Sequence, residues 1–437
     1  MLKRIFMNFV LVLLVTVCSN LNVLAQDFKV DGIGYDIVSF DDLTCRVVGK
    51  YSGDLVIPEK VNYAGRTLAV VGISSQENSN YLTGITIPNT VNELCENMFK
   101  GCKRLARVRI EDGRTALNVG ALKDTYTHEN GAFADCPVTS LYLGRDCEGW
   151  GASLFQCDFM SEYMHKHNKD NLTDVTIGNS VSYIMDDMFA NCIHLTNVTI
   201  GNYVTRIGER AFSGCNSLAG VVIPNSVTEI SDRAFEHCKC LTSIVIPNSV
   251  IAMGEYVFYD CIGLMTVELP HSWNSISAFC FMNCENLTSV TIPKNAISIG
   301  NCAFYNCKSL TSIVIPNSVI AIGAGAFNGC ATLTSLYSLN VTPPDIIMGD
   351  AVHSGTFTNS QYMTLNVYVP QEALNIYQNA EVWKNFWNLR GFDATGIENI
   401  RNKGVDKNGG YYDCHGIKHG APVRGVNVVS GKKMFVK

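Results

Sequence analysis

The sequence is poor in charge. Only 16% of its 437 residues are charged and 47% are hydrophobic, whereas a typical soluble domain has roughly 25% charged residues. Disorder requires low hydrophobicity and high net charge, so this composition excludes disorder for most of the chain. The net charge is −6 and no basic cluster stands out. Because phosphate binding needs a cationic surface, we expect no nucleic-acid partner.

Long hydrophobic runs are also scarce. The longest apolar run, residues 5–17, is broken by one Asn and is shorter than the roughly 20 residues that cross a bilayer. It follows a basic start at residues 3–4 and precedes small residues, which is typical of a secretory signal peptide. We therefore expect residues 1–25 to be a signal peptide, no transmembrane segment, and an exported chain. Acylation at Cys18 is the alternative, although the preceding valine does not favour it.

Catalytic and metal-binding motifs are lacking as well. The sequence contains no zinc-protease histidine pair, nucleophile-elbow serine, phosphate-binding glycine loop or calcium loop. His165 and His167 lie close together, but no cysteine or acidic residue stands at ligand spacing from them. We expect no enzymatic activity, no cofactor and no metal.

A 23-residue repeat dominates what is present. Leucine recurs at this interval in Leu172, Leu195, Leu218, Leu241, Leu264, Leu287, Leu310 and Leu333. A phenylalanine column follows the same interval, in Phe189, Phe212, Phe235, Phe258, Phe281, Phe304 and Phe327. A cysteine column lies three residues further on, in Cys192, Cys215, Cys238, Cys261, Cys284, Cys307 and Cys330. One such unit cannot bury its apolar face alone, so stacked copies must share one core.

Each part of the repeat has its own structural role. Residues 313–315 are β-branched and predict a short strand, which Pro316 ends because proline cannot donate to a ladder. Val319 and Ile322 then point inward, and Phe327 anchors the returning segment. The sequence therefore predicts a mainly β repeat solenoid, a curved array of 23-residue units.

The ends of the array differ from its middle. We predict an N-terminal β cap over residues 26–81 and the solenoid over residues 82–392. The solenoid closes with a capping strand and an amphipathic helix over 371–387, whose apolar face is Ala373, Tyr377, Val382 and Phe386. Residues 393–437 are predicted to be a linker and a small C-terminal β tail.

These repeats resemble the BspA-like leucine-rich repeat family. The resemblance rests on Ile-Pro-Asn-Ser-Val at 246–250 and 315–319, and on Ala-Phe followed by the column cysteine, as at 234–238. It implies a leucine-rich repeat fold, a secreted or cell-surface protein, and adhesion or scaffolding by binding host, matrix or surface proteins. It implies no catalytic residues. The tail resembles a type IX sorting segment, although Gly416-Ile417 replaces the usual glycine-arginine pair.

Two surfaces are candidates for a protein or glycan partner. One is the outward strand position of successive repeats, Thr176, Thr199, Val222, Val245, Glu268, Thr291 and Val314, because outward strand residues of a solenoid form a continuous face. The other is a pair of insertions, 111–131 and 145–171, which carry Tyr126, Trp150, Phe155, Phe159 and Tyr163. Strand propensity and local packing explain the same residues without a ligand. A structural surface-assembly component, and more remotely a carbohydrate-binding solenoid, are the alternative functions.

The chain has 18 cysteines, which in an exported protein suggests disulfides. Neighbouring column residues would have parallel Cα–Cβ bonds, which keeps their Cβ atoms about 4.8 Å apart rather than the roughly 3.8 Å of a disulfide. We therefore predict a ladder of mostly free, buried thiols.

Overall fold

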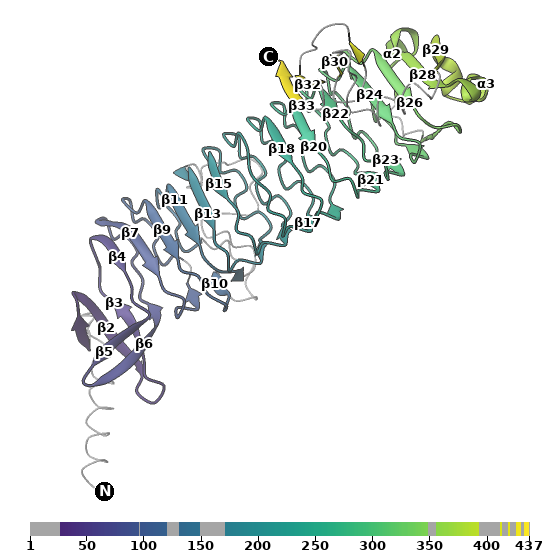
Figure 1. Cartoon of the computed structure of the whole chain (residues 1–437). Helices are drawn as coiled ribbons and strands as arrows, with labels where there is room; N and C mark the ends of the chain where they lie inside the picture. Colours follow the sequence, from purple (N-terminus) through teal and green to yellow (C-terminus); the bar gives the residue numbers. More distant parts are fainter. Residues whose placement is uncertain are drawn as a thin grey trace, which may run out of the picture.

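The structure is a computed structural model and describes residues 27–95, 97–119, 131–148, 171–347 and 355–392, with the backbone of four strands between 411 and 436. The repeats stack into a long solenoid with a cap at each end (Figure 1). This confirms the predicted mainly β solenoid. The predicted signal peptide lies outside the described residues.

The N-terminal cap is a curled five-stranded sheet in the order β1-β2-β3-β6-β5. Its strands are β1 (Phe28–Val30), β2 (Ile33–Ser39), β3 (Thr44–Val48), β5 (Lys60–Tyr63) and β6 (Arg66–Ile73). The rings of Phe28 and Tyr63 stack with their centroids 4.1 Å apart, which joins the first strand to the last. β4 (Gly53–Val56) leaves this cap and pairs with the first repeat strand, so it connects the cap to the solenoid.

One side of the solenoid is formed by the longer strands, here called the long-strand sheet, which pair in parallel wherever they are hydrogen-bonded. After β4 come β7 (Leu82–Ile87), β9 (Arg107–Ile110), β11 (Ser140–Leu143), β13 (Asp174–Ile177) and β15 (Asn197–Thr199). They continue with β18 (Ser243–Val245), β20 (Thr266–Glu268), β22 (Ser289–Val290), β24 (Ser312–Ile315), β26 (Ser335–Ser338), β28 (Asn366–Pro370) and β29 (Asn388–Phe392). Alternate residues face the core, as in Ile313 and Ile315, which are fully buried.

A second side, the short-strand sheet, carries two- and three-residue strands. They are β8 (Glu93–Leu94), β10 (Leu117–Val119), β12 (Cys147–Glu148), β14 (Tyr183–Ile184), β16 (Arg206–Ile207), β17 (Glu229–Ile230), β19 (Ala252–Met253), β21 (Ser275–Ile276), β23 (Ser298–Ile299), β25 (Ala321–Ile322) and β27 (Asp345–Ile346). Val319 and Ile322 are fully buried between the two sheets, as predicted.

The phenylalanine and cysteine columns form the third side. From Phe189 to Phe327 each ring stacks on that of the next repeat, with centroids 5.4–5.8 Å apart. Such ring pairs add to the stabilisation from buried area alone. Every described column cysteine is fully buried, so the columns form one continuous core along the solenoid.

One repeat departs from the expected strand pattern. Residues 218–223 form no strand, although their neighbours in the adjacent repeats do. Gly220 has no side chain to pack, and a Cβ there would meet no heavy atom within 4 Å. Glycine in a strand interior weakens the strand, so the expected strand around Val222 is absent.

The C-terminal closure corrects a second expectation. The predicted helix over 371–387 is instead η3 (Gln371–Ala373), α3 (Leu374–Asn379) and η4 (Trp383–Asn385). The chain becomes extended at Ala380, which brings Trp383 and Phe386 into the core beside Tyr377. Val382, predicted on the apolar face, is only half-buried.

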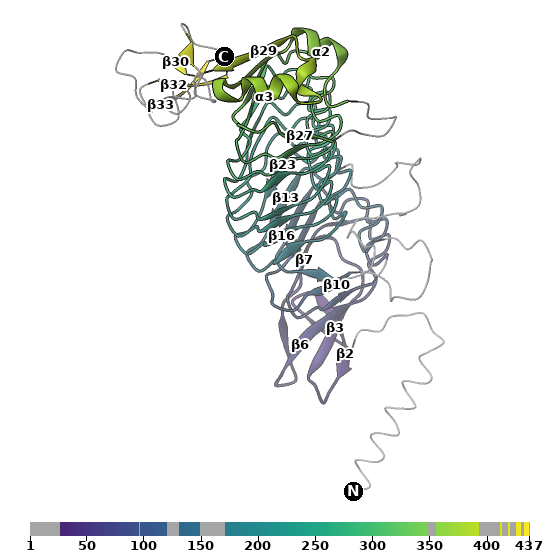
Figure 2. The same ribbon diagram turned by 90° about the vertical axis from the view of Figure 1, so that its right-hand side faces the viewer.

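An additional helix, α2 (Asn359–Thr364), precedes β28 and begins with a capping box between Thr358 and Gln361. Figure 2 shows α3 lying across the C-terminal end of the stack.

The tail contains β30 (Tyr411–Tyr412), β31 (Lys418–His419), β32 (Gly425–Val429) and β33 (Lys432–Val436) in one antiparallel sheet. None of the helices among the described residues has the length and apolar character of a membrane span.

Candidate functional site

The outward positions of the long-strand sheet form a line along the solenoid, here called the stripe. It consists of Thr176, Thr199, Val222, Val245, Glu268, Thr291 and Val314. Strand register places Thr176 beside Thr199, and Val245 beside Glu268. All are exposed except Val314, which is half-buried. The register therefore aligns these two pairs, whereas Val222 lies in the segment 218–223, which forms no strand.

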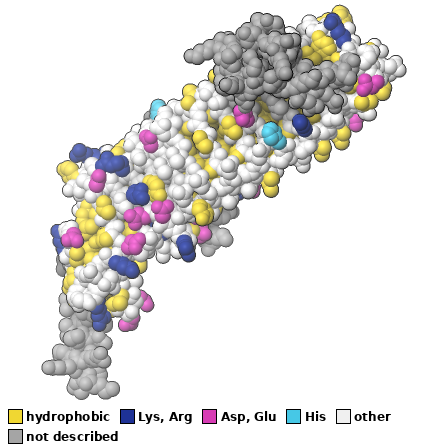
Figure 3. Space-filling view, viewed as in Figure 1, with side chains coloured by type: hydrophobic (Ala, Val, Ile, Leu, Met, Phe, Trp, Pro, Cys, Tyr) yellow, Lys and Arg dark blue, Asp and Glu magenta, His cyan; other side chains and the backbone are white. Residues whose placement is uncertain are grey.

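The stripe is apolar at its centre. Val222 is 82% exposed and Val245 is 56% exposed, and Glu268 is the only charged member. In the space-filling view, charged side chains gather over the N-terminal repeats and are sparse along the middle of the solenoid (Figure 3). An exposed apolar strand face of this kind can contact a partner without the cost of desolvating charges.

Aromatic residues at both ends of the same column were not among the predicted site residues. At the N-terminal end, the Arg109 guanidinium lies 3.9 Å from the ring centroid of Tyr142, whose hydroxyl donates to Asp112 at 2.8 Å. At the C-terminal end, Tyr337 and Tyr368 stack with centroids 4.7 Å apart. The strand alignment already places Tyr142 at an outward position, and continuing it by one repeat beyond Val314 would have identified Tyr337 from the sequence.

The aromatic residues of the two insertions, Tyr126, Trp150, Phe155, Phe159 and Tyr163, lie outside the described residues. The described parts of the insertions include β10 and β12, which belong to the short-strand sheet. The segment beside β12 is anchored by Arg145. This fully buried side chain donates to the carbonyls of Pro88, Asn89 and Val91, and burial lowers its pKa.

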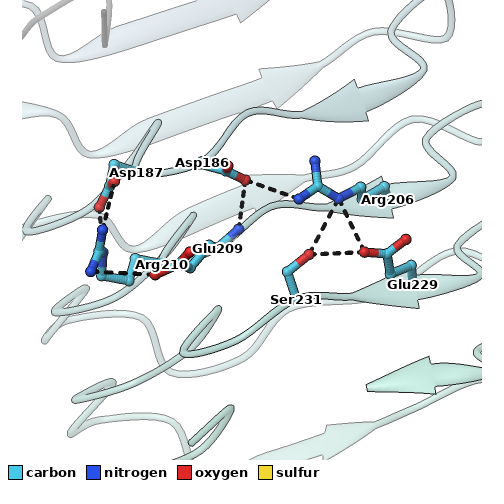
Figure 4. Close-up of polar contacts among 7 residues, drawn as sticks. All are labelled: Asp186, Asp187, Arg206, Glu209, Arg210, Glu229 and Ser231. Carbon is cyan, nitrogen blue, oxygen red and sulfur yellow. Dashed lines mark hydrogen bonds and ion pairs between the residues drawn. The ribbon is translucent and has the colours of Figure 1, made fainter. Parts of the chain in front are cut away.

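Ion pairs connect neighbouring repeats on the short-strand side (Figure 4). Arg206 lies 3.2 Å from both Asp186 and Glu229, and Arg210 lies 2.8 Å from Asp187. These side chains are about one-third to one-half exposed, and such pairs contribute roughly 0–1 kcal/mol each. These ion pairs connect adjacent repeats on the short-strand side, whereas the stripe has a single charged member, Glu268.

A column of large side chains continues from this network. Arg233, Tyr256 and Phe279 occupy equivalent positions and all have a positive φ, where a later repeat has Gly325. The Arg233 guanidinium lies 4.8 Å from the Tyr256 ring centroid, and that ring stacks on Phe279 at 4.3 Å. These contacts between repeats offset the cost of a left-handed backbone, which is about 1–2 kcal/mol for a residue other than glycine.

Among the described residues, no group of three or more His, Cys, Asp or Glu side chains has the geometry to hold a metal ion. His165 and His167 are outside this part of the chain.

Comparison with known proteins identifies the repeats. The family described as BspA type leucine rich repeat region, in six copies, matches residues 71–168, 160–277 and 274–380. The chain belongs to this BspA-type leucine-rich repeat family. It is a repeat family of bacterial surface proteins, and leucine-rich repeat proteins are generally non-catalytic binding proteins. A comparison with curated proteins finds no match.

Several solved structures are similar to this BspA-type chain. A leucine-rich repeat protein from Bacteroides ovatus is 23% identical, with a TM-score of 0.47, covering 84% of this chain and all of that one. A leucine rich cell surface protein from Faecalibacterium prausnitzii is 24% identical, with a TM-score of 0.30, covering 73% of this chain and 96% of that one. The pneumococcal vaccine antigen PcpA is 16% identical, with a TM-score of 0.38, covering 84% of this chain and 97% of that one.

The BspA-type cysteine column has a defined hydrogen-bonding role. The Sγ atoms of Cys215, Cys261 and Cys330 each donate to the carbonyl of a phenylalanine 26 residues earlier, at 3.0–3.2 Å. The 15 cysteines of the described residues form no disulfide with one another, in agreement with the predicted ladder. Burial raises the pKa of Cys330 to about 12, so these buried thiols are poor nucleophiles at neutral pH.

Proposed function

We propose that the chain is an exported, non-catalytic adhesion or interaction protein that binds a protein partner through the stripe. The observation that supports this proposal is the apolar centre of the stripe, at the exposed side chains of Val222 and Val245. Host extracellular matrix and surface proteins are the partners that the family resemblance favours. Exposed apolar residues on a rigid sheet bind without losing backbone entropy, because the repeats already fix the geometry.

Binding experiments with matched variants test this proposal. The purified chain would be assayed against a panel of matrix proteins, mucins and glycans, beside the double variant Val222→Glu/Val245→Glu. A partner that contacts the centre of the stripe would have to bury the two introduced carboxylates. Binding of the panel member that the parent chain binds should therefore fall at least tenfold in the double variant. Ile251→Glu is the control, because Ile251 is 77% exposed but lies next to the short-strand sheet.

Two results would contradict the proposal. Binding that survives in the double variant but is lost when residues 149–170 are replaced by a short glycine-serine linker would assign recognition to the insertions. A chain that binds no panel member, although it is exported and folded, would favour the structural-assembly alternative. Fractionation into surface, periplasm and medium tests the proposed export directly.

A further inference from the structure

Among the residues that the structure describes, the strand that ends the long-strand sheet has an unpaired outer edge. β29 is the outermost strand of its sheet, and its backbone pairs with β28 along its whole length. Among the described residues, no backbone hydrogen bond reaches its outer edge. Figure 1 shows β29 at the end of the stack, beyond β28. An unpaired edge of five residues is a template for an added strand.

The core-facing side of β29 is only partly covered by other side chains. Leu336, Val367 and Leu389 occupy the same register position in three successive strands. The first two are fully buried, whereas Leu389 in the edge strand is half-buried. An apolar side chain on a further strand would cover Leu389, as each strand of the solenoid covers the one before it.

The outer side of the edge carries a charge. Arg390 is exposed and continues the register position of Tyr337 and Tyr368. An added strand would therefore place one outward residue opposite a guanidinium, which favours an acidic residue there. Trp387, immediately before β29, is 76% exposed, so one end of an added strand would lie near an exposed indole.

A second copy of the same edge is a poor occupant. Antiparallel pairing of β29 with itself about its central residue would place Arg390 directly opposite the partner's Arg390. Like charges in this position are destabilising, so the edge discriminates against its own copy and selects a segment of opposite charge.

We propose that β29 binds an extended peptide segment of another protein by strand addition, with a carboxylate of that segment opposite Arg390 and an apolar side chain over Leu389. Main-chain hydrogen bonds would supply affinity, and these two side-chain positions would supply specificity. This surface is separate from the centre of the stripe, so it stands whether or not Val222 and Val245 contact a partner.

The test uses the full chain and two synthetic nine-residue peptides, TVTVEVTVT and TVTVKVTVT, with acetylated and amidated ends. We expect the glutamate peptide to bind about tenfold more tightly than the lysine peptide, and Arg390→Glu to reverse this order. Arg104→Glu, an exposed site far from β29, is the matched control. Binding should change the fluorescence of Trp387, and the change should be lost in Trp387→Phe.

Backbone methylation separates strand addition from side-chain attraction. Methylating the amides of alternate residues blocks one edge of the peptide, so one of the two methylation patterns should abolish binding and the other should not. The proposal is overturned if both patterns bind equally, if Arg390→Glu leaves the order of the peptides unchanged, or if neither peptide binds at 1 mM. A concentration-dependent dimer that the peptide dissociates would assign the edge to a second copy and would also overturn it.

Discussion

The thiol of Cys261 donates a hydrogen bond to the backbone carbonyl of Phe235 at 3.1 Å, across the boundary between two repeats. Both residues are fully buried. The same relationship recurs along the column, which explains why a residue that is both small and able to donate is found there. Alanine would leave the carbonyl without this donor, and a larger apolar residue would not fit a close-packed core.

Removing this donor should destabilise the chain measurably. We expect Cys261→Ala to lower the free energy of unfolding by about 1–2 kcal/mol, because it leaves a small cavity and removes one of the two hydrogen bonds to the Phe235 carbonyl, which also accepts from the Cys238 N–H. Cys261→Ser keeps a donor and should lose less. Urea unfolding followed by circular dichroism measures the change, with exposed Cys240→Ala as a control that should stay within about 0.5 kcal/mol. Equal stability of the two alanine variants would show that the bond contributes nothing.

Exposed cysteines should react with a thiol reagent faster than buried ones. At pH 8 and short exposure to iodoacetamide, we expect Cys95 and Cys240 to be labelled, since they alone are exposed among the described cysteines. Burial raises the pKa of the Cys238, Cys261, Cys284 and Cys307 thiols well above its ordinary value and that of Cys330 to about 12, so little thiolate is available there for reaction. Peptide mapping by mass spectrometry measures the pattern. Labelling of the denatured, unreduced chain should then reach the column, and fewer than about four free thiols would contradict the predicted ladder.

A pair of glycine substitutions tests how tightly neighbouring repeats approach. A Cβ at Gly254 would collide with the backbone nitrogen and side-chain oxygen of Asp232, whereas one at Gly220 would meet nothing within 4 Å. We expect Gly254→Ala to destabilise the chain by about 1–3 kcal/mol and Gly220→Ala to be neutral or stabilising by about 0.5–1 kcal/mol. Thermal unfolding compares the two. A destabilising Gly220→Ala would mean that the gap in the sheet at 218–223 is required.

The pH dependence of stability should contain a contribution from Glu236. Burial raises the pKa of this carboxyl above its ordinary 4.5, against the opposing effect of nearby Arg233 and Arg210. Between 4.5 and the raised value, the folded state holds a proton that the unfolded state has lost, so stability falls as pH rises through this window. Glu236→Gln should remove that fall and become increasingly stabilised relative to the parent chain above pH 4.5. Chemical unfolding from pH 4 to 8 tests this, with the exposed Glu255→Gln as control.

The regular part of the fold was predictable because every repeat packs against its neighbours through the same positions. The spacing of leucine, phenylalanine and cysteine fixes which residues face the core, and periodicity alone is sufficient to find them. The strand alternation likewise placed the stripe, from Thr176 to Val314, on the outer face.

The irregular parts were less predictable, because they depend on tertiary contacts. The helix expected over 371–387 breaks at Ala380 so that Trp383 can reach the core and donate to the carbonyl of Pro344 at 2.9 Å. The capping box of Thr358 and Gln361 is a local signal for α2 that the repeat spacing does not contain. Which surface binds a partner depends on the chemistry of that partner, which the sequence does not contain.

The hydrogen bonds of the cysteine column have a consequence for the length of the protein. Each of these thiols donates to the repeat before it, and each of these phenylalanine carbonyls accepts a thiol from the repeat after it. Duplication or loss of one whole repeat within the gene would therefore leave every thiol with an acceptor. The array can lengthen or shorten in steps of 23 residues while its two caps stay unchanged. A gain or loss of a few residues inside a repeat would instead break the 23-residue register of the column.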